Sequence, residues 1–126
     1  MSPAERASRG PCRLREVVVE VGDVAGAAAF YGRLGLELVK QGHWEGGDYA
    51  ELSDPEGLKV LLIEGDGGVR LAFTVEDVHA ALADAAVEGA VIQAPATPAG
   101  GGLWATAADP WGNAIGFWSP MPRDDG

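Results

Sequence analysis

The chain has 126 residues, 47% hydrophobic and 22% charged, which is the composition of one folded domain rather than of a disordered segment. Nine basic residues against 19 acidic ones give a formal net charge of −10, which excludes the basic surfaces that bind nucleic acid or anionic membranes. The single cysteine, Cys12, excludes an internal disulfide, and no apolar stretch reaches the 18 residues of a membrane helix. We therefore expect a cytoplasmic protein.

The first half of the chain predicts one strand, one helix and three further strands. Residues 15–21 are rich in β-branched side chains, which favour a strand. Asp23 stands where a helix N-cap belongs, and the alanine-rich segment 24–33 predicts a short helix that ends near Gly35. The other strands are predicted at 36–44, 48–53 and 58–64, with a hairpin at Gly46-Gly47 and an Asp-Pro-x-Gly turn at 54–57.

The second half predicts the same order of elements. A strand at 69–75 precedes a helix at 77–87, which ends near Gly89. Three strands follow near 90–94, 102–108 and 114–119. The segment 94–102 is rich in alanine, proline and glycine and is predicted to be a flexible connection.

A weak internal repeat joins the two halves. Val21-Gly22-Asp23-Val24 matches Val75-Glu76-Asp77-Val78, and Asp54-Pro55-Glu56-Gly57 matches Asp109-Pro110-Trp111-Gly112 at nearly the same spacing. Each half is a βαβββ module, the first at about 14–65 and the second at about 68–119. The prediction is one α+β domain over 1–126, a curved, cup-shaped mixed sheet with helices on its convex face. Residues 1–12 and 120–126 are expected to be flexible tails.

Four segments of the sequence resemble the vicinal oxygen chelate superfamily, which includes glyoxalase I, bleomycin resistance proteins, fosfomycin resistance enzymes and extradiol dioxygenases. They are Val-Glu-Val-Gly-Asp-Val (19–24), Ala-Phe-Tyr-Gly-Arg-Leu-Gly-Leu (29–36), Ala-Phe-Thr-Val-Glu-Asp-Val (72–78) and Asp-Pro-Trp-Gly-Asn (109–113). The resemblance implies the family's fold over residues 16–118. It does not choose between the family's metalloenzymes and its metal-free binding proteins.

The metal positions of the family distinguish these two classes. The resemblance places them on four inward-facing strand positions, which here hold Glu16, Leu61, Arg70 and Gly116. Leu61 and Gly116 offer no ligand, and the Arg70 guanidinium stays protonated and repels a cation. Because a catalytic divalent ion usually needs at least three protein ligands, we expect neither a metal nor another cofactor. In character the chain is closest to the metal-free, bleomycin-resistance-like branch.

Strand alternation then predicts which side chains line the cup. Residues 16, 18, 61, 70, 72 and 118 share the inward face, whereas Trp44 and Trp104 lie on strands whose facing the sequence does not fix. The helix-packing layer is predicted to hold Val17, Val19, Val21, Leu71, Phe73, Val75, Ile115 and Phe117. The candidate ligand-binding residues are Glu16, Val18, Trp44, Tyr49, Leu61, Arg70, Ala72, Trp104 and Trp118. Glu16 and Arg70 are alternatively a structural ion pair.

Three functions remain open at this point. The first is a metal-free protein that sequesters a hydrophobic or aromatic antibiotic or natural product, including a cationic one, and that forms a homodimer, as the resemblance implies. The second is a metal-free enzyme with Glu16 as general base and Arg70 as anion stabiliser. The third is a metal-dependent enzyme of the glyoxalase or dioxygenase type.

Overall fold

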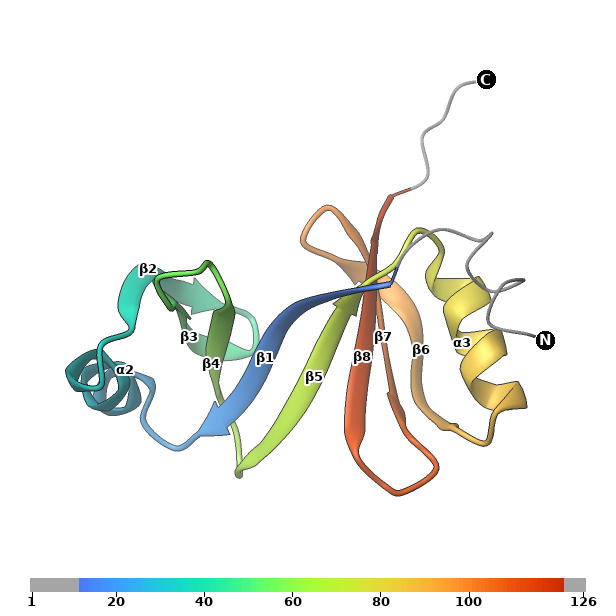
Figure 1. Cartoon of the computed structure of the whole chain (residues 1–126), viewed down its shortest axis with the longest axis horizontal. Coiled ribbons are helices and arrows are strands. Elements are labelled where there is room, and N and C mark those ends of the chain that lie inside the picture. The colour runs from blue at the N-terminus through green and yellow to red at the C-terminus, as the bar shows by residue number, and fades with distance from the viewer. Residues whose placement is uncertain (1–11, 122–126) are drawn as a thin grey trace. The chain divides into compact units, whose positions relative to one another are not determined.

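The computed structural model describes residues 12–121, which form two compact units (Figure 1). One unit, the first module, is residues 15–71. The other joins residues 12–14, the start of β1, to residues 72–121, and residues 72–121 are called the second module. The division falls inside a strand, β5 (Gly68–Thr74), a few residues beyond the boundary predicted from the repeat. Most of the two predicted tails, residues 1–11 and 122–126, lies outside the described residues.

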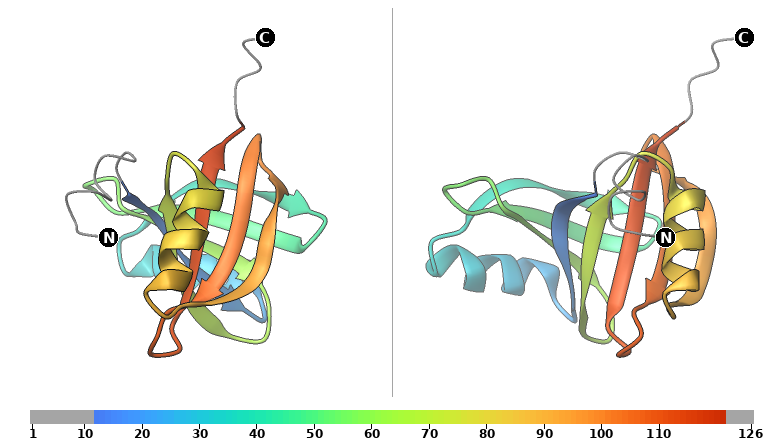
Figure 2. Two further views of the ribbon diagram at one scale, coloured as in Figure 1. Left: turned by 90° about the vertical axis from the view of Figure 1, so that its right-hand side faces the viewer. Right: turned by 45° about the vertical axis from the view of Figure 1, so that its right-hand side comes forward.

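The first module has the predicted βαβββ order. Its elements are β1 (Arg13–Val21), α2 (Val24–Arg33), β2 (Glu37–Trp44), β3 (Gly47–Ser53) and β4 (Lys59–Glu64). The strands lie in the order β2-β3-β4-β1. β1 pairs with β4 in parallel, whereas β2, β3 and β4 pair antiparallel. This mixed sheet, covered on one face by α2, confirms the α+β class (Figures 1 and 2).

Local side-chain chemistry determines where this module changes direction. The Asp23 carboxylate accepts a hydrogen bond from the Gly26 N–H at 3.0 Å and so caps α2. Gly35, with a φ of 112°, ends the same helix in a conformation that favours glycine. Between β3 and β4, Asp54 Oδ1 accepts the N–H groups of Glu56 and Leu58 at 2.9 Å each.

The second module repeats these devices. It contains α3 (Val78–Val87), β6 (Val91–Ala99), β7 (Gly102–Ala108) and β8 (Ala114–Pro120), which follow β5. The strands lie in the order β5-β8-β7-β6, with α3 against β6, β7 and β8 (Figure 2). Asp77 accepts the Ala80 N–H at 3.2 Å, and Asp109 accepts the Trp111 and Asn113 N–H groups. The aspartates that the repeat aligns therefore have the same roles in both modules. Asp23 and Asp77 cap helices, and Asp54 and Asp109 organise turns.

The predicted flexible connection at 94–102 is wrong. β6 continues through Pro95 and Pro98 to Ala99, and only Gly100 and Gly101 form the turn before β7. β6 is the edge strand of this module, where a proline without an N–H is tolerated. Its pairing with β7 also shifts register between Ile92 and Thr97, which accommodates the first proline. At the other end of the chain, β8 includes Pro120, a residue expected in the tail.

Each module has its own apolar core beneath its helix. In the first, Ala50, Leu52 and Leu62 are almost fully buried, and Val19 and Val21 pack against them. In the second, Val75, Val78, Ala105 and Phe117 form the core, and Phe73 and Ile115 pack against it. The predicted helix-facing position is therefore confirmed for Val19, Val21, Phe73, Val75, Ile115 and Phe117. Val17 belongs to neither core, and Leu71 is 42% exposed. No helix within residues 12–121 has the length and apolar character needed to cross a membrane.

Candidate functional site

A pocket of about 230 Å³ lies on the first module, on strands whose other face packs against α2. Side chains of all four strands line it. They are Arg15, Glu16, Lys40, Trp44, Tyr49, Glu51 and Leu61. The register explains why they meet: Tyr49 and Glu51 alternate on β3 with the buried residues Ala50 and Leu52, and Leu61 on β4 is opposite Glu51.

Two aromatic rings form one wall of the pocket. The centroids of the Trp44 and Tyr49 rings lie 6.0 Å apart with an interplanar angle of 64°, an edge-to-face arrangement. Tyr49 is paired across the ladder with Gly42, and its ring lies over that glycine. A Cβ atom at position 42 would come within 2.9 Å of the Tyr49 hydroxyl oxygen. Because Gly42 has no side chain, the Tyr49 ring has room to lie over β2.

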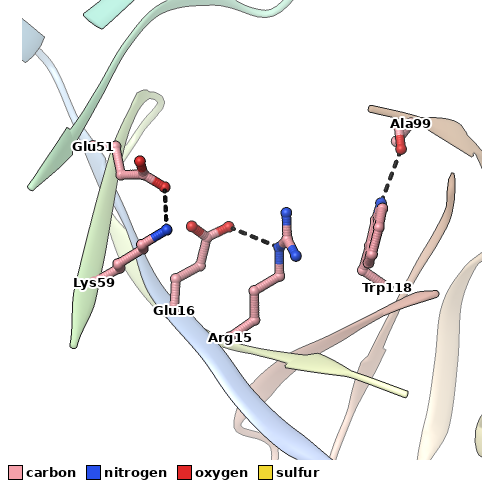
Figure 3. Close-up of polar contacts among 6 residues, drawn as sticks. All are labelled: Arg15, Glu16, Glu51, Lys59, Ala99 and Trp118. Atoms are coloured by element: carbon pink, nitrogen blue, oxygen red, sulfur yellow. Dashed lines mark hydrogen bonds and ion pairs between the residues drawn. The ribbon is translucent and has the colours of Figure 1, made fainter. Parts of the chain in front are cut away.

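Charged side chains form the rest of the pocket. The Glu16 carboxylate lies 3.8 Å from Arg15 Nε, and the Glu51 carboxylate lies 3.7 Å from Lys59 Nζ (Figure 3). The Glu16 side chain is only 12% exposed, whereas that of Arg15 is 42% exposed. The pocket thus combines an aromatic wall, an apolar residue on β4 and a nearly buried carboxylate.

The electrostatics of Glu16 are those of a buried acid. Burial raises the pKa of Glu16 above its ordinary value, because the ionised carboxylate loses hydration. The positive charges of Arg15 and Lys59 lower this pKa, and the negative charge of Glu51 raises it, so that desolvation remains the largest effect. A carboxyl group with a raised pKa in a pocket is a recognised mark of a functional site.

Four of the nine candidate ligand-binding residues line this pocket, namely Glu16, Trp44, Tyr49 and Leu61. Val18 and Ala72 are buried, at 8% and 0% exposure. Arg70 is half-buried and lies outside the pocket lining. The ion-pair partner that the structure gives Glu16 is Arg15, so the pairing of Glu16 with Arg70 stays a prediction.

The remaining two candidates, Trp104 and Trp118, lie in the second module as cross-strand partners on β7 and β8. They share the face opposite α3, since their neighbours Ala105 and Phe117 belong to the helix-side core. A Cβ atom added at Gly116 would collide with the Trp104 ring, and one added at Gly102 would lie 2.6 Å from the Trp118 ring. Trp118 also donates its indole N–H to the Ala99 carbonyl at 2.9 Å (Figure 3). Both rings are therefore held against their own sheet.

Three residues that line the pocket were not among the candidates, namely Arg15, Lys40 and Glu51. Lys40 lies on β2 two and four residues from Gly42 and Trp44, so the facing of Trp44 would have identified it. A register shift between Leu38 and Lys40 reverses the alternation of β2, which is why the sequence left that facing open. Arg15 reaches the pocket from near the start of β1 through its long side chain.

The residues at the family's metal positions do not fit a divalent ion. Glu16 supplies one carboxylate, Leu61 and Gly116 supply no donor, and Arg70 is a cation. The space beside Gly116 is taken by the Trp104 ring. Within residues 12–121, His, Cys, Asp and Glu side chains do not form any group of three that could hold a metal.

Comparison with known proteins gives the same assignment of fold. A hypothetical protein from Bacillus halodurans C-125 matches with a TM-score of 0.74 at 17% identity, over 93% of this chain and 100% of that one. The methylmalonyl-CoA epimerase of Mycobacterium tuberculosis matches with a TM-score of 0.66 at 20% identity, over 87% and 89% of the chains. These identities show the fold alone.

A third similar structure is a glyoxalase/bleomycin resistance protein/dioxygenase superfamily member from Vibrio splendidus 12B01, with a TM-score of 0.60, 16% identity and 88% and 100% coverage. No curated protein matches the sequence. The family model for the same superfamily matches residues 13–117, nearly the whole described chain. The chain therefore belongs to the glyoxalase/bleomycin resistance protein/dioxygenase superfamily, the vicinal oxygen chelate fold that its sequence motifs resemble.

Proposed function

We propose that this chain binds an aromatic small molecule in the pocket of its first module without the help of a metal. The observation that carries the proposal is the pocket itself, in which Trp44, Tyr49 and Leu61 offer apolar contacts beside a few charged groups. Apolar walls with few polar groups are the usual composition of a small-molecule site. The donor set at the family's metal positions supports the metal-free part of the proposal, since only Glu16 can ligate.

Sequestration of an antibiotic or natural product is the biological role that we propose for this binding. The resemblance to metal-free resistance proteins supports it. The volume of about 230 Å³ is smaller than the roughly 300–1,000 Å³ of a drug-sized site. The pocket would therefore receive one ring of a larger molecule, or the whole of a small one. The homodimer stays a prediction, which light scattering of the purified chain would test.

The test is a fluorescence screen of aromatic compounds against the full chain in the presence of EDTA. A ligand in the pocket should quench the emission of Trp44, so the signal should disappear in Trp44→Phe. Trp111→Phe is the matched control, because Trp111 is 84% exposed in a turn of the second module. Quenching that survives in Trp44→Phe, or that requires added zinc, nickel or manganese, would contradict the proposal.

A second candidate function, metal-free catalysis, rests on the raised pKa of Glu16. A carboxyl group whose pKa is raised by burial is a better general base near neutral pH than an exposed one. In this candidate function the anion stabiliser would be Arg15 in place of Arg70, since Arg15 lies beside Glu16 in the pocket lining. Glu16→Gln should abolish turnover and keep ligand binding, whereas the control Glu20→Gln on the same strand should keep both. Full turnover in Glu16→Gln would exclude this function.

A further inference from the structure

The charged groups around the pocket are not all paired with one another. Both carboxylates already have a cationic neighbour. Glu16 lies 3.8 Å from Arg15, and Glu51 lies 3.7 Å from Lys59. A third cation, Lys40, also lines the pocket. Lys59 does not line the pocket, so the four charged side chains that do, Arg15, Glu16, Lys40 and Glu51, carry two positive and two negative charges.

Lys40 is the cation that remains available to a ligand. It lies opposite Glu51 across the β2–β3 ladder, yet within residues 12–121 it forms no ion pair, because Glu51 is turned towards Lys59. Its ammonium group is exposed on the same face as Trp44 and Tyr49. An ammonium group carries three hydrogen-bond donors and no acceptor, so a ligand group that satisfies it must be an acceptor, best an anion.

The local charge therefore differs from that of the whole molecule. The chain carries −10, but at physiological salt charges are screened over about 8 Å, so the groups that line the pocket dominate inside it. Those groups sum to zero, and Lys40 is the one among them whose charge no ion pair offsets within residues 12–121.

The apolar part of the pocket specifies the rest of the ligand. The edge-to-face arrangement of Trp44 and Tyr49 offers ring surface on one side, and Leu61 offers an aliphatic contact on β4. A volume of about 230 Å³ accommodates a single aromatic ring with a short acidic arm rather than a polycyclic molecule.

We propose that the pocket of the first module selects a small aromatic anion, with its ring against Trp44 and Tyr49 and its acidic group bound by Lys40. This inference rests on the proposed function and specifies the chemical class of the ligand. It differs from the cationic ligand that the net charge alone suggests.

The experiment compares three probes of similar size and different charge: phenylacetate, phenylacetamide and phenethylammonium. Each is titrated into the full chain, and the Trp44 indole N–H signal in the ¹H–¹⁵N spectrum reports the dissociation constant. We expect phenylacetate to bind at least about tenfold more tightly than the amide, as charge-assisted hydrogen bonds are the stronger kind. Lys40→Gln should reduce phenylacetate affinity to that of the amide and leave amide affinity unchanged.

Arg33→Gln is the matched control, because Arg33 is exposed in the last turn of α2 and does not line the pocket. Equal or tighter binding of the amide or the ammonium probe at Trp44 would overturn the inference and leave the proposed function intact. Phenylacetate binding that Lys40→Gln does not weaken would also overturn it. No response of Trp44 to any of the three would overturn the inference and the proposed function together.

Discussion

The two modules carry aromatic residues at equivalent positions, but the two rings lie over different neighbouring strands. Tyr49 on β3 and Trp104 on β7 occupy matching positions of the repeat, and both lie on the face away from their helix. The Tyr49 ring lies over Gly42 on β2, whereas the Trp104 ring lies over Gly116 on β8. In each module the ring covers the neighbouring strand that carries a glycine, because only glycine lets a flat ring approach the backbone so closely.

This difference separates an open face from a closed one. The position that matches Gly116 in the first module is Leu61, whose side chain lines the pocket. In the second module the tryptophan fills the corresponding place itself. The repeats thus differ at one matching position. Leu61 in the first module lines a pocket, whereas the Trp104 ring lies over Gly116 in the second. Substitutions at Gly116 and Gly42 test whether these glycines determine where the two rings lie.

The largest effect is expected from Gly116→Val, which gives the second module a branched side chain like that at position 61. Gly116 is buried, and the new side chain would collide with the Trp104 ring. Overpacking of this kind should lower the free energy of unfolding by about 1–3 kcal/mol, as measured by urea denaturation. Gly22→Val is the control, since no atom lies within 4 Å of a Cβ there.

The same prediction can be sharpened with a double variant. If the Trp104 ring is the obstacle, Gly116→Val should cost less in a Trp104→Ala background than in the wild-type chain, a coupling that a double-mutant cycle measures. Equal costs in the two backgrounds would show that the ring does not determine the need for glycine at position 116.

Gly42→Val should close the pocket with a smaller effect on stability. The new side chain would meet the tyrosine hydroxyl at 2.9 Å and ring carbons at 3.1 Å, so the ring must turn off β2. These atoms belong to the far end of a side chain, and valine favours a strand, so the change in unfolding free energy should stay below about 1 kcal/mol. Binding of the aromatic probes should weaken at least about tenfold if the ring turns over Leu61. Unchanged affinity would mean that the place of Tyr49 does not keep the pocket open.

Glu16→Gln should stabilise the protein at neutral pH. The pKa of Glu16 is raised in the folded chain, so the folded state binds its proton more tightly than the unfolded state. The resulting stability is fully present below the ordinary value of 4.5 and is lost as the pH rises through the raised pKa. At pH 7 the buried carboxylate is therefore a cost that glutamine removes.

Thermal unfolding between pH 7.5 and 4.5 measures this effect. The melting temperature of Glu16→Gln should exceed that of the wild type at the upper end, and the difference should shrink as the pH falls. Glu56→Gln, an exposed residue in the turn between β3 and β4, is the control and should show no such trend. A wild type that is more stable than Glu16→Gln at pH 7.5 would show that the Arg15 ion pair outweighs desolvation.

The smallest effect is expected from Lys59→Gln. Its pair with Glu51 is partly exposed, and such pairs contribute at most about 1 kcal/mol to stability. The pKa of Glu16 should nevertheless rise further, since Lys59 lowers it in the wild type. A ¹³C titration of the Glu16 carboxyl carbon measures that pKa, and a fall would contradict the electrostatic description of the pocket.

Local chemistry made most of the fold predictable from the sequence. Asp23 and Asp77 cap helices, and Asp54 and Asp109 organise turns, through contacts with residues only two to four positions away. Alternation along single strands placed Val19 and Phe117 on the helix side for the same reason. β6 was predicted too short because the tolerance for its prolines depends on its edge position, which is a property of the sheet.

The candidate site was harder to predict, because it depends on contacts across strands. The register shift between Leu38 and Lys40 reverses the facing of β2, so alternation counted from the first residues of the strand gives the wrong face for both Lys40 and Trp44. The direction of each ring depends on a glycine of a neighbouring strand, Gly42 or Gly116, and not on the aromatic residue itself. Glu16, Trp44, Tyr49 and Leu61 were nevertheless among the candidates, and they line the pocket.

The most direct measurement is a ¹H–¹⁵N spectrum of the indole N–H signals while the tightest aromatic ligand of the screen is added in EDTA. We expect the Trp44 signal to move until the pocket is saturated, and the signals of Trp104 and Trp118 to stay in place because their rings lie against their own sheet. Movement of Trp104 or Trp118 with Trp44 unchanged, or movement only after a divalent metal is supplied, would contradict it.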